Sequence, residues 1–104
     1  MSDFYLKVGD TSPALLYDIG VNLTGAKSLT FSATDVDTGV KVINAAAASA
    51  VGDPTEGVLR YQWAAPDTAA ARRLNANFRV VYGDDQIETF PNQGHIAITV
   101  ETAG

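Results

Sequence analysis

Thiols are absent from this sequence of 104 residues, which contains no cysteine and one histidine. The lack of cysteine excludes disulfide bonds, thiolate catalysis and cysteine-ligated zinc sites. Apolar runs are short, and none approaches the roughly 20 residues that a membrane-spanning helix needs. The first residues also lack the basic and apolar regions of a secretory signal peptide. We therefore expect a protein that is made in the cytoplasm and has no membrane partner.

Basic residues are scarce as well. Seven lysines and arginines stand against twelve acidic residues, which gives a net charge of −5. Phosphate backbones repel such a chain, so we expect no nucleic-acid partner. Hydrophobic residues make up 46% of the sequence and charged residues 18%, as in an ordinary globular protein. The length supports a single domain over residues 1–104 with one small core.

Apolar and polar residues alternate with a period of two through most of the chain. The alternation is clearest over residues 4–8, 29–33, 59–65, 74–82 and 96–100, and turn-forming residues separate these stretches. The spacing predicts about seven or eight short strands, with a turn about every 8–12 residues. We therefore predict an all-β fold, an antiparallel immunoglobulin-like β-sandwich, with a small barrel as the alternative.

Two segments depart from the alternation. Residues 44–51 are rich in alanine, which favours helices and disfavours strands. Because this segment lies between two strand patterns, we favour an extended strand or a bend there and leave a short helix open. Residues 66–73 predict one or two helical turns, with Asp67 or Thr68 as the N-terminal cap and two arginines near the C-terminal end.

The single histidine, His95, is the first candidate for acid–base catalysis. Its parity with Thr99 and Glu101 places it on the polar face of the last predicted strand, at the mouth of a turn. The sequence contains no G-x-S-x-G motif that would pair a nucleophilic serine with it. We therefore interpret His95 as a surface residue.

Closely spaced carboxylates have a similar explanation. Asp35 and Asp37 resemble the start of a calcium loop, but an EF-hand needs a glutamate at the twelfth position, where Ala46 stands. Asp53 and Glu56 lie in a turn with proline and glycine, where acidic residues are common. We predict no catalytic, metal-ligating or cofactor-binding residues, and we expect the protein not to be an enzyme.

Most large aromatic residues alternate with polar neighbours and are expected in the core: Phe31, Tyr61, Trp63, Phe78 and Tyr82. Tyr5 and Tyr17 are better candidates for exposed contacts. Exposed aromatic side chains would suit a carbohydrate-binding β-sandwich module for attachment to a host surface. We carry that module as the alternative function.

The order of turns and strands resembles a known family over nearly the full chain. The matching segments are FYLKVGDTSP at 4–13, VNLTGA at 21–26, FSAT at 31–34, GVLRYQW at 57–63, DT at 67–68, FRV at 78–80, TFP at 89–91 and IAITV at 96–100. They resemble the N-terminal immunoglobulin-like domain of phage baseplate upper proteins, found in structural proteins of tailed phages and prophages.

This resemblance implies a virion structural protein. The chain would be a small adaptor or attachment subunit of the tail, baseplate or capsid surface, made in the host cytoplasm and located in the virion. Its partners would be other phage virion proteins, in a symmetric multicopy or homo-oligomeric arrangement. No catalytic residues follow from the resemblance.

Partner binding is expected at the first strand and at the turn after it, because an edge strand presents unpaired N–H and C=O groups. The residues proposed for this surface are Phe4, Tyr5, Asp10, Thr11, Ser12 and Pro13.

Overall fold

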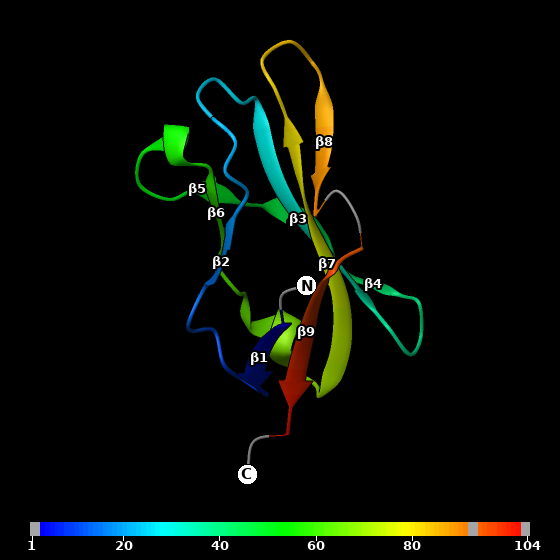
Figure 1. Ribbon diagram of the computed structural model, residues 1–104. Helices are drawn as coiled ribbons and strands as arrows, with labels where there is room; N and C mark the ends of the chain where they lie inside the picture. Colours follow the sequence, from blue (N-terminus) through cyan, green and yellow to red (C-terminus); the bar gives the residue numbers. More distant parts are fainter. Residues whose placement is uncertain (1–2, 92–93, 103–104) are drawn as a thin grey trace.

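The computed structural model describes residues 3–91 and 94–102 (Figure 1). Within these ranges it contains nine strands and two short 3-10 helices. In chain order they are β1 (Asp3–Lys7), β2 (Leu15–Asp18), β3 (Ser28–Asp35), β4 (Lys41–Ala47), β5 (Ser49–Ala50), η1 (Pro54–Glu56), β6 (Val58–Tyr61), η2 (Ala65–Thr68), β7 (Arg72–Val81), β8 (Ile87–Phe90) and β9 (Ile96–Glu101). None of the helices in this part of the chain is long and apolar enough to span a membrane.

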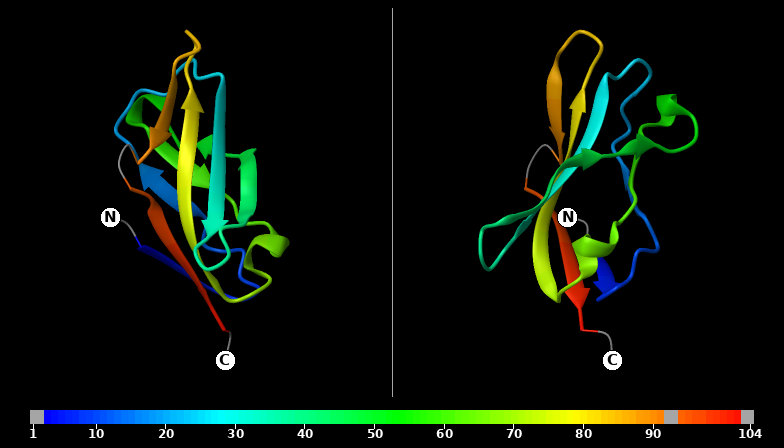
Figure 2. Two further views of the ribbon diagram at one scale, coloured as in Figure 1. Left: turned by 90° about the vertical axis from the view of Figure 1, so that its right-hand side faces the viewer. Right: turned by 180° about the vertical axis from the view of Figure 1, so that it is seen from behind.

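The strands form a large and a small sheet (Figures 1 and 2). The large sheet has the order β1-β9-β7-β3-β4, and β8 also pairs with β7. The long strand β7 pairs with β3 on one edge, and with β9 and then β8 on the other. The small sheet has the order β2-β6-β5. All pairs are antiparallel except β1 with β9. The predicted all-β sandwich is confirmed.

Aromatic rings from both sheets fill the core between them. Phe31 of β3 lies with its ring centroid 4.3 Å from that of Tyr61 and 4.8 Å from that of Phe78. Trp63, just after β6, meets Phe31 edge-on at 5.8 Å. These four side chains are buried, as their alternation predicts, whereas Tyr82 is only partly buried. Because side chains alternate across a strand, the other face of the large sheet is left to polar residues.

The predicted helix over residues 66–73 is wrong in extent. The helical segment is η2, a single 3-10 turn, and Arg72 and Arg73 begin β7. Pairing explains the difference, since Arg72 lies opposite Val100 and Arg73 opposite Thr99 in β9. Tertiary hydrogen bonding to β9 therefore overrides the helix propensity of the alanines.

The alanine-rich residues 44–51 are extended, as favoured from the sequence. They form the end of β4 and the short strand β5. Ala45 has a positive φ of 52°, and the register between β3 and β4 shifts on both sides of Ala33. The segment thus leaves the edge of the large sheet through a bulge in β4 and reaches the edge of the small sheet as β5.

Candidate functional site

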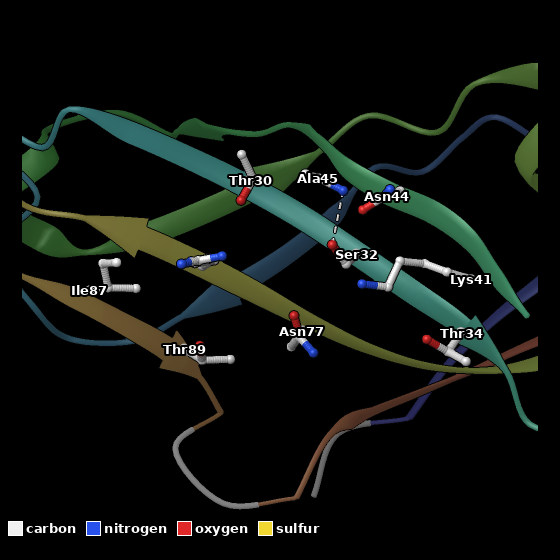
Figure 3. A pocket seen from close by; sticks show the side chains of 10 residues that line it. Thr30, Ser32, Thr34, Lys41, Asn44, Ala45, Asn77, Ile87 and Thr89 are labelled. Atoms are coloured by element: carbon white, nitrogen blue, oxygen red, sulfur yellow. Dashed lines mark hydrogen bonds between the residues drawn. The ribbon is translucent and has the colours of Figure 1, made fainter. Parts of the chain in front are cut away.

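A hollow of about 390 Å³ lies on the polar face of the large sheet, on the side away from the core (Figure 3). Four strands contribute its lining: β3, β4, β7 and β8. We call this cavity the polar hollow. The residues that line it are Thr30, Ser32, Thr34, Lys41, Asn44, Ala45, Asn77, Arg79, Ile87 and Thr89.

Strand register brings these residues together from distant parts of the chain. Thr30 lies opposite Arg79, and Arg79 lies opposite Thr89 on the next strand. Ser32 lies opposite Asn77. Phe31, between the two β3 residues, points into the core, so its neighbours must face outward. The polar hollow is therefore the outward half of the alternation that builds the core.

The irregular strand β4 forms the second wall of the polar hollow. The Ala45 N–H donates a hydrogen bond of 2.9 Å to Ser32 Oγ across the two strands (Figure 3). A bulge of this kind bends a strand and redirects its side chains. Here the wall carries small alanine side chains, and Lys41 and Asn44 line the hollow from β4.

The lining of the polar hollow is rich in hydrogen-bonding groups. Its lining offers hydroxyl, amide, ammonium and guanidinium groups as hydrogen-bond donors. None of the described lining residues is an aspartate, glutamate, histidine or cysteine. A serine or threonine hydroxyl needs an adjacent base to become a nucleophile, and the described lining residues include no such base.

The two predicted contact residues on β1 are separated by the structure. Phe4 is half-buried, and its ring lies 5.8 Å from that of Trp63. Tyr5 is 62% exposed on the opposite face of the strand. Only Tyr5 is therefore placed to meet a partner without rearrangement.

The turn after β1 is anchored to the molecule by its own backbone. Three of its carbonyl oxygens accept side-chain hydrogen bonds: Asp10 from Thr68 Oγ1 (2.8 Å), Thr11 from Gln62 Nε2 (2.6 Å) and Pro13 from Trp63 Nε1 (3.1 Å). The side chains of Thr11, Ser12 and Pro13 are exposed. The turn thus fixes the position of β1, and its role in binding a partner stays a prediction.

Asp10 also covers part of the β1 edge. Its Oδ2 accepts a hydrogen bond of 3.2 Å from the Lys7 N–H, and its own N–H donates to the Lys7 carbonyl at 3.0 Å. Exposed strand edges are sites of unwanted pairing, and proteins commonly cover them. The edge expected to bind a partner is consequently closed at Lys7.

Tyr17 was expected among the exposed aromatic residues, and this expectation is wrong. Its ring is half-buried and stacks on Phe78 with centroids 6.0 Å apart. Tyr5 is the aromatic side chain that the described residues leave strongly exposed. Residues 3–91 and 94–102 therefore offer no aromatic platform of the kind that a carbohydrate module requires.

In the acidic turns, the aspartate carboxylates accept hydrogen bonds from neighbouring residues of the same turn. Asp35 Oδ1 accepts a hydrogen bond of 2.8 Å from the Asp37 N–H. Asp53 Oδ1 accepts from the Thr55 N–H at 3.0 Å and from its hydroxyl at 2.9 Å. The backbone hydrogen bond from Thr55 lowers the pKa of Asp53 below its usual value. Both carboxylates are thus occupied in stabilising local backbone.

The described residues do not fit a transition-metal site. Such sites draw on imidazole, thiolate and carboxylate ligands. The chain has no cysteine and one histidine, His95, which is half-buried just before β9 and outside the polar hollow. No group of three or more histidine, aspartate or glutamate side chains that could hold a metal occurs in residues 3–91 and 94–102.

A buried pair, Tyr61 and Asp67, escaped sequence analysis. The Tyr61 hydroxyl donates a hydrogen bond of 2.6 Å to Asp67 Oδ2, which also accepts from the Ala64 N–H at 2.8 Å. Burial, followed by the hydrogen bond to Asp67, raises the pKa of Tyr61 above its usual value. Asp67 is only 8% exposed, so we assign the pair to the stability of η2. A signal was present, because a buried tyrosine hydroxyl needs a partner.

Comparison with known proteins gives a fold and no family. No protein-family model and no curated protein matches the sequence. A solved structure, CopC from Methylosinus trichosporium OB3b, matches with a TM-score of 0.62. The match covers 100% of this chain and 88% of that chain at 17% sequence identity. At this identity the likeness shows a shared β-sandwich fold.

This comparison corrects the expected function and location. CopC is not a phage virion protein, so the prediction of a virion structural protein located in the virion is wrong. The expectation that the protein is not an enzyme stays a prediction. The resemblance to the baseplate-domain family stays a prediction, because none of the comparisons bears on it.

Proposed function

We propose that this protein is a non-enzymatic binding domain whose ligand site is the polar hollow. The observation that carries the proposal is the convergence of hydrogen-bonding side chains from four strands around a volume of about 390 Å³. Pockets for small ligands usually measure about 300–1,000 Å³. The polar lining suits a hydrophilic ligand that is held by hydrogen bonds.

We propose a non-enzymatic role because of the side chains that line the polar hollow. General acid–base chemistry needs a group whose pKa lies near the working pH, within hydrogen-bond reach of the reacting atom. The described lining supplies no carboxylate or imidazole. The Tyr61–Asp67 pair lies on the other side of the large sheet, in the core, and burial raises the pKa of Tyr61 away from the working range.

Nuclear magnetic resonance of the ¹⁵N-labelled protein tests the proposal. The protein would be titrated separately with glutarate, a three-carbon bisphosphate and glycerol, as probes of different charge. We expect saturable shifts at the amides of Thr30, Ser32 and Asn77 with at least one probe. The amides of Arg60 and Gln62, on the small sheet and just after it, should not move.

Two substitutions on the same face of β7 provide a matched comparison. Asn77 lines the polar hollow, whereas Asn75, two residues earlier on the same face, does not. Asn77→Leu should abolish the shifts because it replaces an amide donor with a branched apolar side chain, and Asn75→Leu should preserve them. Saturable shifts confined to another surface, equal effects of the two substitutions, or no saturable shift with any probe would overturn the proposal.

A further inference from the structure

The chain has seven basic residues, and they differ in whether their charged groups have ion-pair or hydrogen-bond partners. Three form ion pairs: Lys7 with Glu101 at 3.1 Å, Lys27 with Asp85, and Arg73 with Asp37 at 3.4 Å. Two donate hydrogen bonds: Arg60 to Gln62 Oε1 at 2.9 Å and Arg72 to the Ala70 carbonyl at 3.4 Å. For the side chains of Lys41 and Arg79, the described part of the chain provides no partner of either kind.

Both of these cations line the polar hollow, and none of its described lining residues is acidic. The rest of the chain has the opposite balance, with a net charge of −5 overall. A small anion is therefore repelled by the molecule as a whole and attracted at this one described hollow. Charge of the opposite sign, gathered in a concave site, raises the local concentration of such a ligand.

The strand register fixes the distance between the Cα atoms of Lys41 and Arg79. Lys41 pairs with Thr34 of β3, while Arg79 pairs with Thr30 of the same strand on its other edge. With strands about 4.8 Å apart and about 3.3 Å per residue, the two Cα atoms are about 16 Å from one another. The lysine and arginine side chains each extend several ångströms from Cα and both line the polar hollow, so a short ligand with two anionic groups can contact both.

We infer that the polar hollow binds a small dianion, with one oxyanion group on Arg79 and the other on Lys41. This inference rests on the proposed function and adds the chemical class of the ligand. A guanidinium offers two parallel N–H donors to a carboxylate or phosphate, and an ammonium acts as a point charge. The common chemistry is therefore a pair of carboxylate or phosphate groups joined by a short linker.

Ser32 supports the middle of such a ligand. Its oxygen accepts the hydrogen bond from the Ala45 N–H. A serine hydroxyl that accepts in this way still has its own hydrogen to donate. Across the strands, Asn77 contributes an amide that lines the same space. A ligand spanning the two cations thus passes over neutral donors.

Isothermal titration calorimetry of the full chain would measure this inference. The probes are glutarate and a three-carbon bisphosphate, each with two anionic groups, acetate with one anionic group, and glutaramide as the neutral analogue of glutarate. We expect one dianion to bind at least about fivefold more tightly than acetate, and glutaramide not to bind. The tighter of the two dianions identifies carboxylate or phosphate as the preferred group.

Charge-removing substitutions provide the controls. Arg79→Gln and Lys41→Gln should each weaken binding of the dianion about fivefold. Arg60→Gln, which removes an exposed charge from the small sheet, should leave it unchanged. An equal loss with Arg60→Gln, or equally tight binding of glutaramide, would overturn the inference.

The two proposals fail in different ways. If glutaramide shifts the amides of the polar hollow as strongly as glutarate does, the binding function stands and the dianion is wrong. If no probe produces saturable shifts there, both are wrong. Unchanged thermal midpoints in the two variants would show that a loss of binding is not a loss of folding.

Discussion

At the scale of single residues, the hydrogen-bonded pair of Tyr61 and Asp67 is a polar contact buried in the core. A buried carboxylate is costly unless donors surround it, and here a hydroxyl and a backbone N–H do so. The pKa of Tyr61 is raised, first by burial and then by this hydrogen bond. The folded state therefore holds the tyrosine proton more strongly than the unfolded chain, whose tyrosines have a pKa near 10.0.

The sign of the pH dependence follows from that shift. Stabilisation by Tyr61 is fully present below pH 10.0 and is lost as the pH rises above it, because only the unfolded state then loses the proton. We expect the urea-derived free energy of unfolding to fall as the pH rises above about 10. Tyr61→Phe should cost about 1–3 kcal/mol at neutral pH and flatten this fall, whereas exposed Tyr5→Phe should do neither. An alkaline fall that is as steep in Tyr61→Phe would contradict this account.

At the scale of elements, strict alternation was sufficient for prediction and helix propensity was not. Strand β7 keeps Leu74, Ala76 and Phe78 on the core side, and the same pattern was visible in the sequence. The sequence Ala-Ala-Ala-Arg-Arg favours a helix locally, but pairing with β9 makes its arginines the start of β7. Such pairing joins segments about a quarter of the chain apart, which no local pattern reveals.

The turn between η1 and β6 depends on Gly57. Its φ of 73° lies in the left-handed region, and a Cβ there would press against the backbone nitrogen and carbonyl oxygen of Val21. Gly39 has a similar φ of 72° but open space around it. A substitution there therefore measures the cost of the positive φ alone, without a steric clash. We expect Gly39→Ala to lose about 1–2 kcal/mol and Gly57→Ala to lose clearly more in urea denaturation. Equal losses would show that the contact with Val21 relaxes freely.

At the scale of the whole molecule, the polar hollow shows what a sequence conceals. The outward positions of β3 were recognisable as polar from their alternation with Phe31 and Ala33. What the sequence could not show is that Arg79 would lie beside Thr30 and that β4, with its bulge at Ala45, would line the same hollow. These facts depend on strand order and register, which are properties of the assembled sheet. Individual side chains were therefore placed on the correct face, while the site they form was missed.

The same assembly makes Phe31 the residue on which both sheets depend. It is fully buried and contacts the rings of Tyr61 in the small sheet, of Trp63 just after it, and of Phe78 in its own sheet. Replacing such a phenylalanine with alanine typically costs about 3–5 kcal/mol, a large part of the roughly 5–15 kcal/mol that stabilises a domain. We expect Phe31→Ala to shift the unfolding midpoint equally when it is followed by Trp63 fluorescence and by far-ultraviolet circular dichroism. Ser28→Ala, exposed on the same strand, should shift neither, and an earlier loss of the fluorescence signal in Phe31→Ala would mean that the small sheet unfolds independently.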